Sequence, residues 1–215
     1  MFAKDIALLP DWQQQIWVGF NIAPEGGISK ELHAAQVKAT PASTQAPEKF
    51  LISEMRRLDN IAKGKLKTSI FRDLDPDIDL LKRTHRFRAT DNIGLYALAK
   101  DIERIVIAKL DKTLIKSVIT PPPDGKDWGS IKLLENMLAS KIGDKEARKI
   151  TAPLVGINEL RIGDAHEKSE KGIKDALELV GIDAKAPSIT QGYQLLDSCV
   201  STLSKISKII ENWDK

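Results

Sequence analysis

The residues best suited to chemistry lie in one short segment, INELRIGDAHEKS, which covers residues 157–169. Arg161 and His166 are five positions apart in it. On a continuous helix, which turns about 100° per residue, two such side chains would point about 140° apart. Gly163 lies between them and lets the chain leave helical geometry at little energetic cost. We therefore expect His166 to turn back towards the guanidinium of Arg161.

Together these side chains could bind a phosphate and move a proton. A guanidinium holds a phosphate with two parallel hydrogen bonds, and an imidazole exchanges protons near neutral pH. Asp164 or Glu167 supplies a carboxylate that could orient the imidazole of His166. A single histidine with no cysteine partner is a poor zinc site. The segment thus predicts chemistry on a phosphate with neither a metal nor a cofactor.

The elements that must position this segment are expected to be helices. The chain has 215 residues, of which 42% are hydrophobic and 29% charged, a balance typical of a folded globular protein. Apolar residues recur at spacings of three and four, and β-branched alternation is scarce. We expect an all-α protein: an antiparallel four-helix bundle with an additional N-terminal helical lobe. The lobe would cover residues 1–89 and the bundle residues 90–215.

Four segments carry the helical pattern of the bundle. Residues 90–120 predict one long helix of seven or eight turns, which ends at three consecutive prolines. Gly143 is expected to end the second helix, and Pro153 to mark a kink or a restart in the third. The four predicted helices cover residues 90–120, 130–143, 144–163 and 187–213.

Composition sets limits on partners and location. The formal net charge of +3 permits an anionic partner without requiring one. No apolar run approaches the roughly 20 residues that span a bilayer, and the N-terminus makes a poor signal peptide. Cys199 is the only cysteine and excludes an internal disulfide; its helical context predicts a buried small residue. The expected location is the cytoplasm, without membrane association.

The phrase LRIGDAH, residues 160–166, resembles the R-x4-6-H signature of the HEPN (higher eukaryotes and prokaryotes nucleotide-binding) superfamily, in the wording of bacterial antiviral and abortive-infection members. Its place late in an all-α bundle, before the last long helix, is also similar. The resemblance covers about residues 90–213, and residues 1–89 resemble no family.

The resemblance implies a specific activity. Many HEPN proteins are metal-independent endoribonucleases whose Arg and His residues meet across a homodimer. Carried over by motif position, Arg161 would stabilise the scissile phosphate, and His166 would act as general base or acid for attack by the RNA 2′-hydroxyl. The roles of similar HEPN proteins further imply a toxin or effector of antiviral defence, with a possible neutralising protein partner.

One departure from the family pattern leaves an alternative open. The residue after the motif arginine is commonly polar in the family, and here it is Ile162. A phosphate-contacting group would then be absent, and Asp164 would replace it only as an orienting group. This departure favours a non-catalytic HEPN-like module for dimerisation or for binding RNA or a nucleotide. A second alternative is a helical partner-binding scaffold, led by Trp12 and Trp17 of the N-terminal lobe.

A second cluster of charge is the basic segment, which we define as residues 82–88 (KRTHRFR). Its cations could follow an RNA backbone. Phe87 could stack on a base, but we expect it instead to anchor the lobe to the bundle. The predicted RNA-binding residues are Lys82, Arg83, Arg86 and Arg88.

Overall fold

The computed structural model confirms an all-α protein. It describes residues 6–19, 33–35, 37–39, 46–75, 77–119, 127–163 and 170–213. Within those ranges no strand forms, and the only β-type pairing is an isolated bridge between Phe71 and Leu110. The predicted site residues Asp164 and His166 lie outside the described residues.

The chain divides into two compact units, residues 1–45 and residues 46–215. The first contains α2 (Asp11–Gly19), on which Trp12 and Ile16 are exposed. The expected boundary at residue 89 differs from this division. The helix α4, which the sequence assigned to the lobe, belongs to the second unit and buries its apolar face in the core of that unit.

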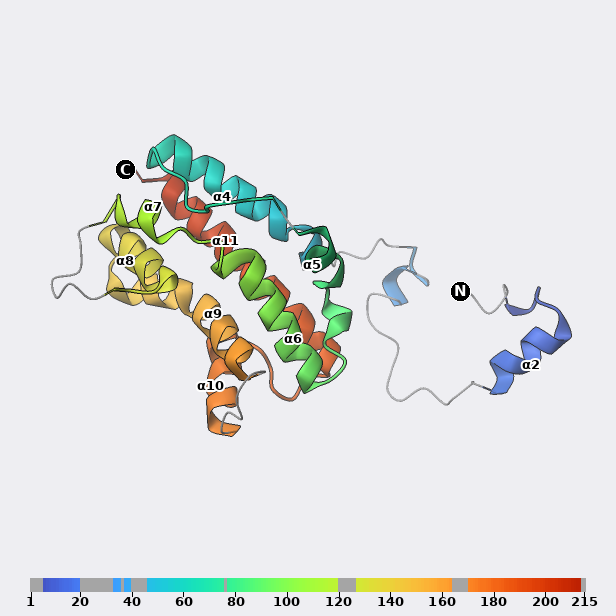
Figure 1. Cartoon of the computed structure of the whole chain (residues 1–215). Coiled ribbons are helices and arrows are strands. Elements are labelled where there is room, and N and C mark those ends of the chain that lie inside the picture. The colour runs from blue at the N-terminus through green and yellow to red at the C-terminus, as the bar shows by residue number, and fades with distance from the viewer. Residues whose placement is uncertain are drawn as a thin grey trace. The chain divides into compact units, whose positions relative to one another are not determined.

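The helix α4 (Leu51–Lys65) lies along the last helix, α11 (Ser188–Glu211), as Figure 1 shows. Leu51, Met55 and Leu58 of α4 are buried. A short 3₁₀ turn, η1 (Pro47–Lys49), precedes α4. It begins with a proline, which suits a first helical turn because it has no N–H to satisfy. This packing joins the α4 region to the helices that follow.

A short connecting region leads from α4 to the next long helix, α6 (Asn92–Ile102). It contains α5 (Ile78–Arg83) and the 3₁₀ turn η2 (Arg86–Arg88). The carboxylate of Asp91 accepts a hydrogen bond from the backbone N–H of Gly94 and caps α6. The η2 turn packs against both α6 and α11, so it ties the ends of these helices together.

The expected single helix over residues 90–120 is wrong. After α6 the chain forms one π-helical turn, η3 (Glu103–Ile107), then leaves helical geometry and restarts as α7 (Lys112–Lys116). The break has two causes: backbone hydrogen bonds to residues 70–72, and a new helix cap at Asp111. Backbone hydrogen bonds join the Lys109 carbonyl to the N–H of Arg72, and the Asp111 N–H to the Ile70 carbonyl. The Asp111 carboxylate then caps the restarted helix.

The next two helices form a hairpin, as the sequence predicts. They are α8 (Ser130–Ile142) and α9 (Asp144–Gly163), and they pack on each other. Gly143 separates them with a φ of +81°, a conformation that glycine adopts without steric strain. α9 runs through Pro153 without a break in its helical assignment.

The helix α10 (Glu170–Val180) packs closely on α9. Gly156 permits the approach: a Cβ atom there would lie 2.6 Å from a methyl group of Val180 and 2.7 Å from the Ala176 carbonyl oxygen. α9 also contacts α6 and α11. The expected antiparallel arrangement of four helices stays a prediction. Two helices outside the predicted four, α4 and α10, also pack against members of this group. No helix in the described ranges is long and apolar enough to cross a membrane.

A second close approach gives a test of this packing. Gly192→Ala in α11 is expected to lower the free energy of unfolding by about 1–3 kcal/mol. The new Cβ would lie 2.7 Å from both the Ala89 Cβ and the Arg86 carbonyl oxygen, and the η2 turn would have to move. Urea unfolding measures the change.

The matched control is Gly64→Ala on the exposed side of α4. Nothing lies within 4 Å of a Cβ at this position. Alanine has the higher helix propensity, so this variant is expected to gain up to about 1 kcal/mol. Equal stabilities of the two variants would contradict the proposed close packing of η2 against α11.

Candidate functional site

Arg161 lies near the end of α9, where the apolar stripe of that helix fixes its position. Leu154, Ile157 and Leu160 are buried in the core. The side chain of Arg161 follows directly after Leu160 and is 39% exposed. It therefore reaches solvent from a helix whose apolar side is buried in the core.

The partner of Arg161 is Glu103, the first residue of the π-helical turn η3. Its side chain is 12% exposed, and one of its carboxylate oxygens lies 3.6 Å from Nη1 of Arg161. Burying a carboxylate is costly unless a cation compensates it. Arg161 therefore stabilises Glu103 as much as Glu103 stabilises Arg161. The sequence did not single out Glu103, because the two residues are far apart along the chain.

Glu103 does not engage the whole guanidinium of Arg161 in close hydrogen bonds. A separation of 3.6 Å is longer than the 2.7–2.9 Å typical of a charge-assisted hydrogen bond. The buried Nε of Arg161 has no hydrogen-bond partner among the described residues. The group is thus held electrostatically without having all its N–H groups occupied. Asp164, His166 and Glu167 lie outside the described residues.

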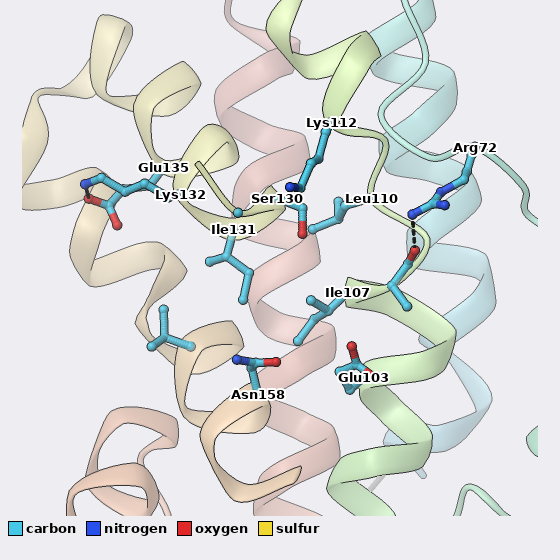
Figure 2. A pocket seen from close by; sticks show the side chains of 13 residues that line it. Arg72, Glu103, Ile107, Leu110, Lys112, Ser130, Ile131, Lys132, Glu135 and Asn158 are labelled. Atoms are coloured by element: carbon cyan, nitrogen blue, oxygen red, sulfur yellow. Dashed lines mark hydrogen bonds and ion pairs between the residues drawn. The ribbon is translucent and has the colours of Figure 1, made fainter. Parts of the chain in front are cut away.

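An open cavity of about 480 Å³ adjoins this ion pair (Figure 2). Glu103 lines it, and so does Asn158, which lies one turn before Arg161 on α9. The remaining walls come from η3, the segment after it, the start of α8, and Arg72. The lining residues are Arg72, Glu103, Ile107, Ala108, Leu110, Lys112, Gly129, Ser130, Ile131, Lys132, Glu135, Val155 and Asn158.

The arginines of the basic segment all pair with carboxylates. Asp101 has a side chain that is 3% exposed, and its oxygens lie 3.2 Å from Arg83 and 3.0 Å from Arg88. Arg86 pairs with Glu48 at 3.2 Å and lies over the Tyr193 ring at 4.9 Å. These contacts fix the segment against α6, η1 and α11.

The other two notable side chains of the basic segment face solvent. Lys82 pairs only loosely with Asp79, at 3.6 Å, and its side chain is 73% exposed. Phe87 is 62% exposed, so the expectation that it anchors the lobe to the bundle is wrong. Its ring lies 6.2 Å from that of His85. Hydrophobicity alone did not reveal this, because the neighbouring arginines make the anchoring contacts instead.

Two further groups bear on the chemistry available. Cys199 is fully buried, as predicted, and burial raises the pKa of its thiol to about 12. A thiol that stays protonated at neutral pH is a poor nucleophile. Among the residues that the structure describes, no three His, Cys, Asp or Glu side chains come together as metal ligands.

Comparisons of the chain with protein-family models, with curated proteins and with solved structures find no match. The HEPN resemblance therefore rests on the signature of residues 160–166 and on its place in a helical protein.

Proposed function

We propose that this protein is a HEPN-type, metal-independent endoribonuclease. The observation that supports it best is the ion pair of Arg161 with Glu103 beside the cavity. A buried carboxylate holds the guanidinium in place while part of it remains exposed. A positioned cation with free N–H groups stabilises the charge that builds on a phosphate during displacement.

In the proposed mechanism, Arg161 binds the scissile phosphate and stabilises its transition state. His166 removes the proton from the 2′-hydroxyl, or donates one to the leaving 5′-oxygen, and a cyclic phosphate end results. Asp164 orients the imidazole of His166. A homodimer would bring two such sets into one composite site. Lys82, with the basic segment behind it, would extend the contact with RNA.

The role in the cell belongs to the same proposal. We infer a cytoplasmic toxin or effector of antiviral defence, with a neutralising protein partner. Its support is the similarity of the LRIGDAH phrase to that of abortive-infection members. Expression of the wild-type protein would then slow bacterial growth, and His166→Ala would relieve the effect.

The decisive experiment incubates purified protein with RNA in EDTA. His166→Ala is expected to lower the cleavage rate by about 100-fold or more, because general acid-base catalysis contributes about that much. Gel or sequencing analysis of the products measures it, and cyclic phosphate ends identify the reaction. The same cleavage pattern and rate from wild type and His166→Ala would refute the catalytic role.

Ile162 supports a second candidate, a non-catalytic HEPN-like module that binds RNA or a nucleotide. The hydrophobic residue after Arg161 offers no hydrogen bond to a phosphate. This reading predicts that RNA binding survives loss of both Arg161 and His166, with no cleavage by any variant. Filter binding of the double variant separates the two candidates.

A further inference from the structure

Part of the cavity lining divides into two polar ends and an apolar middle, while the charged side chains of Arg72, Lys132 and Glu135 line its other sides (Figure 2). Lys112 and Ser130 lie close together at one end. Glu103 and Asn158 face each other at the other end, on η3 and α9. Between the two polar ends, Ile107 and Ile131 form apolar walls, and Leu110 lies beside Ser130. A molecule that is charged at one end and flat or apolar in the middle would match these groups.

The end with Lys112 and Ser130 suits an anion. Lys112 contributes an ammonium group, and Ser130 a hydroxyl with no hydrogen-bond partner among the described residues. Ser130 is also the first residue of α8, and the N-cap residue Gly129 makes no side-chain cap hydrogen bond. The N–H groups of the first turn and the helix dipole add positive potential to the lysine charge.

The middle and the far end suit a nucleobase. Aliphatic side chains such as Ile107 and Ile131 can contact the faces of a ring. The Asn158 amide, without a hydrogen-bond partner among the described residues, offers both a donor and an acceptor to its edge. A volume of about 480 Å³ lies in the range of small-ligand sites and is too small to admit a duplex.

We propose that the cavity, which is lined by Glu103, the ion-pair partner of Arg161, binds one unpaired nucleotide of an RNA strand. This inference rests on the proposed function, since the ion pair of Glu103 and Arg161 connects the cavity to the catalytic arginine. The phosphate of the bound nucleotide lies at Lys112 and Ser130. Its base lies between the apolar walls, with its edge at Asn158. Cleavage is then confined to single-stranded positions.

The carboxylates around the cavity allow this. Glu103 is paired with Arg161, and Glu135 lies 2.6 Å from Lys132. Asp127 is 70% exposed and bridges Lys112 at 3.2 Å and Lys116 at 3.0 Å. The pair with Asp127 is exposed and weak, so a phosphate can replace it at Lys112. Asp127 is thus a competitor for the anion.

The test measures binding of a short single-stranded RNA with methylated 2′-hydroxyls, which cannot be cleaved, by fluorescence anisotropy. Lys112→Gln is expected to weaken binding about tenfold, the loss of one charge-assisted contact. The slope of log Kd against log salt should fall by about 0.7, one phosphate contact on a single strand. Asp127→Asn should tighten binding, because it removes the competing carboxylate.

Lys116→Gln is the matched control. It loses the same Asp127 partner but does not line the cavity, so it should change binding far less than Lys112→Gln does. Equal losses in Lys112→Gln and Lys116→Gln would overturn the proposal. Duplex RNA that binds as tightly as the single strand would also overturn it. A free nucleoside monophosphate that binds as tightly as the RNA would assign the cavity to a free nucleotide and not to a strand.

This binding assay is independent of cleavage. If binding depends on Lys112 but the protein cleaves no RNA, the proposed ribonuclease activity is refuted and the proposed nucleotide site stands. If cleavage depends on His166 but Lys112→Gln leaves RNA binding unchanged, the proposed nucleotide site is refuted and the proposed ribonuclease activity stands.

Discussion

Arg161→Ala is expected to lower the rate of RNA cleavage by about 1000-fold. Loss of a single well-placed donor to transition-state charge costs about 100-fold to 1000-fold in other enzymes, and Arg161 would contribute both charge and hydrogen bonds. Single-turnover kinetics with RNA in EDTA measures the effect. Cleavage by Arg161→Ala at the wild-type rate would show that the guanidinium serves only the ion pair with Glu103.

The ion pair calls for a control on folding. Arg161→Ala leaves the Glu103 carboxylate in a largely buried place without its cation, which should cost about 1–3 kcal/mol of stability. The double variant Arg161→Ala/Glu103→Gln removes that charge and should regain part of the loss. It should remain inactive. Arg161→Lys keeps a positive charge without the planar fork, so its activity should also stay well below wild type.

Asp59→Ala is expected to lower the free energy of unfolding by about 3 kcal/mol or more. The Asp59 side chain is 1% exposed and ion-paired with Lys63 at 2.8 Å. Its carboxylate accepts hydrogen bonds from the Ser69 hydroxyl and from the backbone N–H groups of Ile70 and Phe71, at 2.9 and 3.2 Å. Without it, two buried N–H groups lose their partner, and each such loss costs about 1–3 kcal/mol.

The same network predicts a dependence on pH. Burial by itself raises the pKa of Asp59, but the contacts with Lys63, Ser69 and the two N–H groups outweigh it and lower the pKa overall. A carboxyl group whose pKa is lowered by folding stabilises the fold above its unfolded pKa, about 3.9 for aspartate. That contribution is lost as the pH falls through the lower, folded pKa.

Asp59→Asn isolates the charge, because it keeps the shape of the side chain. Urea unfolding between pH 7 and pH 3 should show a smaller loss of stability on acidification for this variant than for the wild type. The exposed Asp73, whose pKa is also lowered, chiefly by its contact with Lys109, offers a comparison: Asp73→Asn should destabilise less than Asp59→Asn at pH 7. Parallel pH curves for wild type and Asp59→Asn would contradict the assignment.

Local pattern predicted α8, α9 and α11, because their causes are local; α10 was not among the predicted helices. Gly143 marks the turn between α8 and α9, and the apolar spacing around Leu196 and Leu203 marks α11. The break after η3 could not be predicted in this way. It depends on backbone contacts with residues 70–72, and Arg72 also donates to the Ala108 carbonyl, 36 residues along the chain.

The candidate site divides in the same manner. Arg161 was predicted from its spacing to His166, a local property. Glu103 was missed because only the packing of α9 against η3 brings it to Arg161. The carboxylates that pair with the arginines of the basic segment were missed for the same reason. Charge counts along the sequence show cations in residues 82–88 but not the distant partners that fix them.

Asp101 and Glu103 are only two positions apart, which places them about 200° from each other around the helix axis. One pairs with Arg83 and Arg88, the other with Arg161. Rotation of this helix in either direction would strain the ion pairs on both sides at once. Ion pairs on two opposite sides therefore fix the rotation of the helix about its axis. A displacement of the basic segment would rotate this helix and so act on Arg161.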